Sequence, residues 1–375
     1  MSDFSNSFLE KLTNQRFSYR QYSKVQFAGQ GIVLEQNKEP ALSGGIRPFF
    51  TRAMENVPIE DASPEDDIIT ISRKAGIVDE NTGRPLYLLL ERAKNAGCRI
   101  VVADALDDEP YISSQLAPAL EMTDLLVRGA QLACEAIAAD EVRVEIYKEL
   151  GETRVEIGET LGGLPVDRVG AGYPADNSLI QKHREEKAFV FGVGSLIHLA
   201  RAVDEHRMQT TTFLTVAGDG VSEAVNLEVT LDKTAGEILR QFGLSDDTSR
   251  VVIGGSMRGT AITDLDSTRI TPVSRGLLAL REVFRDYYYT CIGCGKCTDV
   301  CPVGLSPYYL YQFVQSKRYE RLEDFDIDLC ISCGTCSYVC PAKLNVSAEI
   351  ARGQMEMLQY MTDHPKTETQ EEALQ

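Results

Sequence analysis

The stretch Cys291-Ile-Gly-Cys-Gly-Lys-Cys-Thr-Asp-Val-Cys-Pro302 occurs a second time as Cys330-Ile-Ser-Cys-Gly-Thr-Cys-Ser-Tyr-Val-Cys-Pro341. In each copy, three cysteines lie at intervals of three residues, and a fourth follows directly before a proline. Cys330 lies 39 positions after Cys291, and nine of the fifteen residues that begin at these positions are identical. Eight of the ten cysteines lie in these two windows, so the C-terminal part of the chain is an internal repeat of cysteine motifs.

The spacing of the cysteines indicates what they bind. The run C-x2-C-x2-C-x3-C-P binds [4Fe–4S] clusters in bacterial two-cluster ferredoxins. Three thiolates in one tight loop supply three ligands, and Gly293, Gly295 and Gly334 suit such a loop because glycine tolerates positive φ angles. The fourth cysteine of each run usually ligates the other cluster. This rule assigns Cys291, Cys294, Cys297 and Cys340 to one predicted cluster, and Cys330, Cys333, Cys336 and Cys301 to the other.

Zinc and disulfides are the alternative uses of closely spaced cysteines. Zinc sites also use C-x2-C pairs, but they need neither a third cysteine at the same interval nor a fourth before proline. Disulfides are typical of oxidising compartments, whereas the first twenty residues lack a hydrophobic signal core. Cys98 and Cys134 lie outside the repeat and are predicted to be small core residues.

The composition predicts a cytoplasmic protein of about two or three domains, because the chain has 375 residues of which 43% are hydrophobic. The formal net charge of −18 argues against nucleic acid and against adsorption to anionic lipid, and it favours partners with a basic surface. The longest apolar run, residues 188–200, is too short for a membrane span and includes His198.

The part of the chain before the repeat alternates between strand and helix patterns, which predicts an α/β domain with a largely parallel sheet. The expected strands are residues 68–72, 99–103, 142–147, 188–191 and one near Val155. The expected helices are residues 85–96, 116–139 and 195–203.

A second, smaller module follows. Residues 213–217, 226–231 and 251–253 are predicted strands, and residues 234–242 a predicted helix whose capping box joins Thr234 and Glu237. This order of elements is typical of a β-grasp module. The glycine-rich residues 254–259 lack the Lys-Ser/Thr of a phosphate-binding P-loop, so a surface turn is expected. A helix over residues 277–289 is expected to lead into the first cysteine window.

With these residues in view, the chain resembles the C subunit of the Rnf electron-transport complex, a relative of the flavin-bearing NADH dehydrogenase subunit of complex I. The resemblance runs from Gly44 to Gln354, and besides the cysteine repeat it rests on Gly44-Gly-Ile-Arg-Pro48, Glu109-Pro-Tyr-Ile112, Tyr173-Pro174, Thr215-Val-Ala-Gly-Asp219, Val251-Val-Ile-Gly-Gly-Ser-Met257 and Asp264-Leu-Asp266. It implies a flavin-subunit-like α/β domain, a β-grasp domain of the soluble-ligand-binding (SLBB) type and an α-rich dicluster ferredoxin domain. The corresponding boundaries are an N-terminal extension over 1–43, then 44–205, 206–276 and 277–362, and an acidic tail over 363–375.

The family's flavin site is the part of the resemblance that the residues do not follow. The resemblance implies FMN held by a glycine-rich loop, with NADH above it. The matching place, residues 79–86, has one glycine and begins with Asp79 and Glu80, whose charges are unfavourable beside a phosphate. We therefore predict a degenerate flavin loop, with Glu109 as the one residue carried over as a candidate FMN contact.

These observations favour an electron-transfer subunit of an oxidoreductase. Its two [4Fe–4S] clusters would relay single electrons between a flavoprotein or ferredoxin and a partner reductase or membrane complex, with the protein cytoplasmic and docked on other subunits rather than spanning the membrane. The alternatives are an active, FMN-containing NADH-oxidising subunit of the Rnf type, and a scaffold whose clusters are structural.

Overall fold

The computed structural model describes residues 57–148, 157–170, 172–281 and 289–363, together with two short strands, β1 (Ile32–Val33) and β2 (Phe49–Phe50). The chain divides into two compact units, one formed by residues 12–283 and the other mainly by residues 284–375. The predicted strand near Val155, the tail beyond Asp363 and, apart from β1, the N-terminal extension lie outside the described residues.

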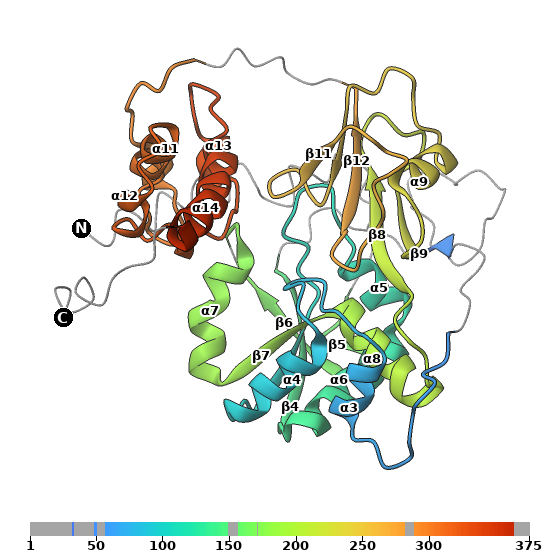
Figure 1. The fold of residues 1–375 in the computed structure, drawn as a ribbon. Coiled ribbons are helices and arrows are strands. Elements are labelled where there is room, and N and C mark those ends of the chain that lie inside the picture. Colours follow the sequence, from blue (N-terminus) through green and yellow to red (C-terminus); the bar gives the residue numbers. More distant parts are fainter. Residues whose placement is uncertain are drawn as a thin grey trace. The chain divides into compact units, whose positions relative to one another are not determined.

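The larger unit contains the predicted parallel sheet (Figure 1). Its strands lie in the order β5 (Thr160–Leu161), β6 (Leu164–Val169), β4 (Glu141–Tyr147), β3 (Ile100–Asp104) and β7 (Ala188–Gly192). All neighbours are parallel except β5, which pairs antiparallel with β6. β3 pairs with β4 along one edge and with β7 along the other. Four of its five residues are buried, as expected for a strand inside a parallel sheet.

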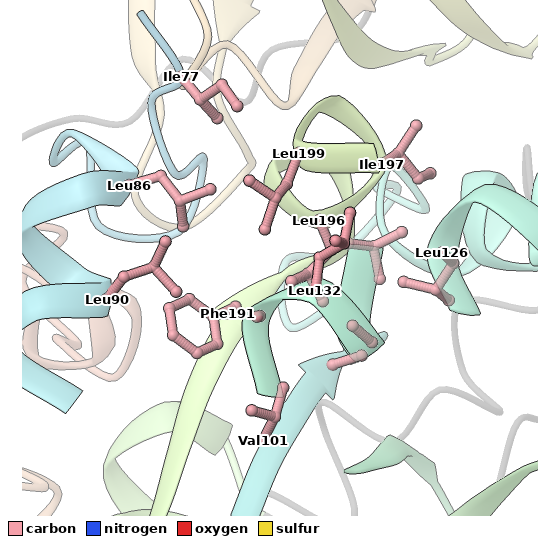
Figure 2. Close-up of a cluster of buried hydrophobic side chains, with 14 of the residues drawn as sticks. Ile77, Leu86, Leu90, Val101, Leu126, Leu132, Phe191, Leu196, Ile197 and Leu199 are labelled. Carbon is pink, nitrogen blue, oxygen red and sulfur yellow. The ribbon is translucent and has the colours of Figure 1, made fainter. Parts of the chain in front are cut away.

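The helices of this part are α3 (Ile68–Lys74), α4 (Leu86–Asn95), α5 (Leu116–Glu121), α6 (Thr123–Ile137), α7 (Ala175–Glu186) and α8 (Val193–Glu205). All but α7 bury apolar residues in one core with the sheet, whereas α7 buries Ala175 and Leu179 in a separate cluster. Figure 2 shows Leu86 and Leu90 of α4 close to Phe191 of β7, with Leu196 and Leu199 of α8 in the same cluster. The strong apolar periodicity of α4, α6 and α8 is the reason that the sequence predicts helices there.

Three predictions need correction. Residues 68–72 are not a strand but the start of α3, because the Asp67 side chain accepts a hydrogen bond from the Thr70 N–H (2.8 Å) and so caps a helix. The helix expected over 277–289 is wrong where the structure describes it, since Gly276–Leu280 is a strand, β12. The helix expected over 116–139 is interrupted at Met122, whose backbone leaves the helical region between α5 and α6.

The second sheet of the larger unit contains the predicted strands β8 (Thr211–Ala217), β9 (Val225–Thr230) and β10 (Arg250–Ile253), as well as β11 (Thr260–Ile262). β12 pairs parallel with β8 and antiparallel with β10, while β1 and β2 pair with β9. Helix α9 (Ala235–Gln241) begins with the predicted capping box of Thr234 and Glu237. The β12 segment was misassigned because its residues are buried almost throughout, so its pattern has no period of two.

The smaller unit is made of short helices around its own core. They are α10 (Lys296–Asp299), α11 (Pro307–Gln315), α12 (Glu320–Glu323), the 3-10 helix η1 (Ile327–Leu329), α13 (Thr335–Tyr338) and α14 (Val346–Asp363). Proline occupies the first turn of α11 after Ser306, where its missing N–H costs no helical hydrogen bond. Leu310 and Val314 of α11 pack with Ile350 of α14, so the two longer helices form the support on which the cysteine loops lie.

Candidate metal centre

The two cysteine loops keep the sequence repeat in their backbone conformation. Gly295 and Gly334 occupy equivalent positions, have φ angles of 74° and 80°, and directly precede α10 and α13. A second equivalent pair, Gly304 and Lys343, has φ angles of 73° and 57°. Left-handed backbone at these points turns each loop sharply, and glycine allows it at little steric cost. Each window therefore forms the same tight loop, followed by one turn of helix.

One cavity of this unit is lined by cysteines from both windows. Its volume is about 400 Å³, including the part open to solvent. The cysteines that line it are Cys291, Cys294, Cys297 and Cys340. Tyr308, Tyr311 and Leu344 are among the side chains that complete the wall. The structure thus brings the fourth cysteine of the second window to the first three cysteines of the first window.

The remaining four cysteines of the repeat also lie near one another. Burial raises the pKa of the Cys336 thiol, and the thiols of Cys333, Cys330, Cys301 and, to a smaller extent, Cys297 raise it further. Burial also raises the pKa of Cys301, and the thiols of Cys333 and Cys330 again raise it further. Hydrogen bonds from the backbone of the following loop lower it. Cys301 therefore lies with the second window, although it belongs to the first.

The chemistry of these two groups of thiols fits an iron–sulfur cluster. Buried, closely spaced thiols resist ionisation, so thiolates at these positions need a cationic group to bind them. Within the part of the chain that the structure describes, no three His, Cys, Asp or Glu side chains converge closely enough to hold a single metal ion. The thiols of Cys291, Cys294, Cys297 and Cys340 instead line the cavity described above. Cys294 is exposed, whereas Cys333 and Cys336 of the second window are buried. Cys98 is buried and Cys134 half-buried, as predicted for core residues.

Glu109, the candidate flavin contact, lies in the larger unit and is buried. Its carboxylate accepts hydrogen bonds from the backbone N–H groups of Met257 (2.8 Å) and Arg258 (3.1 Å), and from the Tyr173 hydroxyl (3.3 Å). A Cβ atom on Gly255 would lie 2.2 Å from this carboxylate, so the glycine permits the close approach. The expected turn over 254–259 is present, and two of its N–H groups, those of Met257 and Arg258, donate to Glu109. A role for Glu109 in flavin binding stays a prediction.

The place where the resemblance puts the flavin loop does not fit a flavin phosphate. Asp79 and Glu80 turn their carboxylates toward the start of α8 and accept hydrogen bonds from backbone N–H groups there. A phosphate at this position would meet two carboxylates instead of free N–H donors. The structure therefore agrees with the degenerate loop predicted from the residues.

One charged group was not found from the sequence. Glu145 of β4 is buried and contacts Lys182 (3.0 Å), His183 (2.9 Å) and Arg143 (3.0 Å). Burial alone would raise the pKa of Glu145, but hydrogen bonds from His183 and Lys182 lower it to about 2. A glutamate in the middle of a strand that is buried on both faces was the available signal, because such a position requires paired charges.

The geometry and the comparisons define the class of the C-terminal unit. Residues 290–344 match the family model described as a 4Fe-4S dicluster domain, which covers both cysteine windows. The chain therefore carries a two-cluster ferredoxin domain in addition to an α/β unit with a second sheet.

Curated proteins are similar to the chain well beyond its C-terminal unit. It is 26% identical over 299 residues to the C subunit of an ion-translocating oxidoreductase complex of Yersinia enterocolitica, a match that covers 74% of this chain and 43% of that protein. It is 26% identical over 314 residues to the C subunit of a proton-translocating ferredoxin:NAD(+) oxidoreductase complex of Clostridium ljungdahlii, covering 79% of this chain and 67% of that protein. The resemblance predicted from the sequence is confirmed: the chain is similar over most of its length to the C subunits of these oxidoreductase complexes.

A solved structure supports the fold. A chain of NAD+-reducing [NiFe]-hydrogenase in the H2-reduced state matches with a TM-score of 0.51 and 14% sequence identity, over 78% of this chain and 62% of that chain. At this identity the likeness concerns the fold alone. Within the described residues, no helix combines the length and the apolar character that crossing a bilayer requires.

Proposed function

We propose that the C-terminal unit holds two [4Fe–4S] clusters and relays single electrons as part of an oxidoreductase. The observation that carries this proposal is the cavity in which Cys340, the fourth cysteine of the second window, joins the first three cysteines of the first window. The proposed ligand sets are Cys291, Cys294, Cys297 and Cys340 for one cluster, and Cys330, Cys333, Cys336 and Cys301 for the other. When bound, such clusters supply reversible one-electron chemistry.

The partners follow from the relatives and from the charge. The Clostridium relative is named as part of a ferredoxin:NAD+ oxidoreductase complex, so we assign redox proteins as partners: a flavoprotein or ferredoxin on one side and a reductase or membrane-complex subunit on the other. The net charge of −18 favours a partner with a basic docking surface. The proposed location is the cytoplasm, peripheral to a membrane complex. The comparisons do not favour the alternative of an active, FMN-containing NADH-oxidising subunit.

The domain organisation is part of the proposal. We assign residues 44–205 to the α/β domain, 206–276 to a β-grasp domain of the SLBB type and 277–362 to the ferredoxin-like domain. The hairpin of β8 and β9, followed by α9, supports the middle assignment. Because β12 pairs with β8, we move the boundary between the middle domain and the ferredoxin-like domain from residue 276 to Leu280.

Paired substitutions test the ligand sets. The full chain, purified and reconstituted anaerobically, should contain about eight irons and give a paramagnetic signal after reduction with dithionite. The variant C291S/C340S removes two ligands of one proposed cluster and should keep about four irons, in a single intact cluster. The variant C330S/C340S removes a ligand from each cluster and should keep neither intact. Cys134→Ser, outside both windows, is the control and should keep about eight irons.

The opposite pattern would overturn the ligand assignment. If C330S/C340S kept one intact cluster and C291S/C340S kept none, each window would serve its own cluster. Zinc in place of iron would overturn the function. A redox titration tests the relay itself, because clusters that stay in one state at physiological potentials would be structural.

A further inference from the structure

Helix α8 begins where an anion would ordinarily find a binding site. Its strand, β7, ends at Gly192 on the carboxyl edge of the parallel sheet, and the helix starts at the next residue with no side-chain cap of its own. The first N–H groups of a helix have no partner within the helix, and together with the helix dipole they attract anions. In an α/β unit, this edge is also where nucleotide phosphates bind.

Carboxylates of the chain already occupy these donors. Glu80 Oε1 accepts a hydrogen bond from the Gly194 N–H (2.6 Å), and Oε2 accepts one from the Ser195 N–H (3.0 Å). Asp79 Oδ2 accepts from the Gly192 N–H (2.8 Å) and from the Ser195 hydroxyl (3.2 Å). Two consecutive acidic residues therefore accept from the N–H groups of Gly192, Gly194 and Ser195, while the Val193 N–H donates to Gln115 Oε1 (3.0 Å).

The glycines of this turn make room for the carboxylate. A Cβ atom on Gly192 would lie 2.4 Å from the Glu80 carboxyl group, and one on Gly194 would lie 2.9 Å from it. Real Cβ atoms do not make contacts this short, so only glycine at these positions allows Glu80 to lie here. A glycine-containing turn that elsewhere brings the backbone close to a phosphate here brings it close to a side chain.

Other donors at the same edge are filled in the same way. Asp107 accepts hydrogen bonds from the N–H groups at the start of α5, and Asp108 accepts one from the Ala175 N–H at the start of α7 (2.9 Å). Glu109 takes the N–H groups of the turn between β10 and β11. Acidic side chains of the chain thus satisfy the backbone donors around this edge.

Occupied donors and charge both act against a phosphate here. Burial raises the pKa of Glu80 to about 7, with a further contribution from the neighbouring Asp79 carboxylate, while hydrogen bonds from the backbone lower it. A phosphate near α8 would meet N–H groups that already donate to Glu80 and Asp79, and the Asp79 carboxylate beside them would repel it.

We infer that Glu80, supported by Asp79, is a built-in replacement for a flavin phosphate at the start of α8, and that this unit consequently does not recognise FMN by its phosphate. The inference is independent of the clusters and of the proposed function, because it concerns the α/β unit alone. It explains how the fold of a flavin-bearing relative is kept without its nucleotide: the anion that the helix needs comes from the chain.

Riboflavin, which lacks the phosphate, makes the test specific. The reconstituted full chain is dialysed to equilibrium against FMN and, separately, against riboflavin, and bound flavin is quantified after extraction. For the wild type we expect no preference between the two ligands. The variant Glu80→Ala frees the N–H groups of Gly194 and Ser195 and removes a charge, so it should bind FMN at least about tenfold more tightly than riboflavin. Glu237→Ala, which removes the capping carboxylate of α9, is the matched control and should show no preference.

The wild type alone decides the main point without any variant. A preference for FMN of about tenfold or more in the wild type would overturn the inference, as would stoichiometric FMN in the purified protein. A Glu80→Ala protein that keeps its far-UV circular dichroism spectrum and its iron but gains no FMN preference would overturn the role of Glu80. Iron content and ligand sets are measured separately, so either proposal can fail while the other stands.

Discussion

Replacing Arg201 by methionine should strongly destabilise the larger unit. Arg201 of α8 forms a bidentate ion pair with Glu228 of β9, in which Nη1 contacts Oε1 and Nη2 lies 3.1 Å from Oε2. The two side chains are 7% and 0% exposed, and the pair links the helix of one sheet to a strand of the other. Methionine would leave the Glu228 carboxylate buried without its cation, with the Thr211 hydroxyl as a remaining donor (2.6 Å). Breaking a buried pair in this way costs about 3–5 kcal/mol.

Anaerobic urea unfolding followed by far-UV circular dichroism measures the loss, while visible absorbance reports on the clusters of the other unit. Arg128→Met is the matched control, because its ion pair with Asp204 also involves α8 but is 45% and 40% exposed, and should be worth less than about 1 kcal/mol. The double variant R201M/E228Q also removes the negative charge of Glu228 and should recover most of the stability. The reasoning is refuted if R201M costs no more than R128M.

Two further predictions concern packing and pH. Gly129→Ala should cost about 1–3 kcal/mol of unfolding free energy, because the new Cβ would lie 1.9 Å from the Leu196 carbonyl oxygen and push α6 away from α8. Gly170→Ala is the control and should cost far less, because a Cβ atom there would have nothing within 4 Å; equal urea midpoints for the two variants would contradict the prediction. Glu145 has a folded pKa of about 2 against an ordinary value of 4.5, so it contributes about 3 kcal/mol above pH 4.5 that is lost as the pH falls toward 2. Glu145→Gln should remove that part of the acid sensitivity, measured by urea unfolding after rapid pH jumps, and an unchanged acid dependence would count against the assignment.

Much of the candidate site could be predicted from the sequence because a cluster loop is a local structure. The spacing of three cysteines and the glycine before each short helix lie within one turn of chain, so neighbouring residues set the geometry. The same holds for the α9 capping box, formed by Thr234 and Glu237 three positions apart. The segments at 68–72 and 277–280 were misassigned because short apolar runs fit a buried helix and a buried strand equally well.

The sequence by itself determined that this protein has a two-cluster cysteine repeat, an α/β unit ahead of it and acidic residues where a flavin loop would need glycines. Only the tertiary structure decided what those acidic residues do. Glu80 and the Gly194 N–H are 114 positions apart in the chain, and no local pattern indicates that they meet. They meet because β7 and the loop that carries Glu80 reach the same edge of one sheet, where unpaired N–H groups at the start of α8 require an anion.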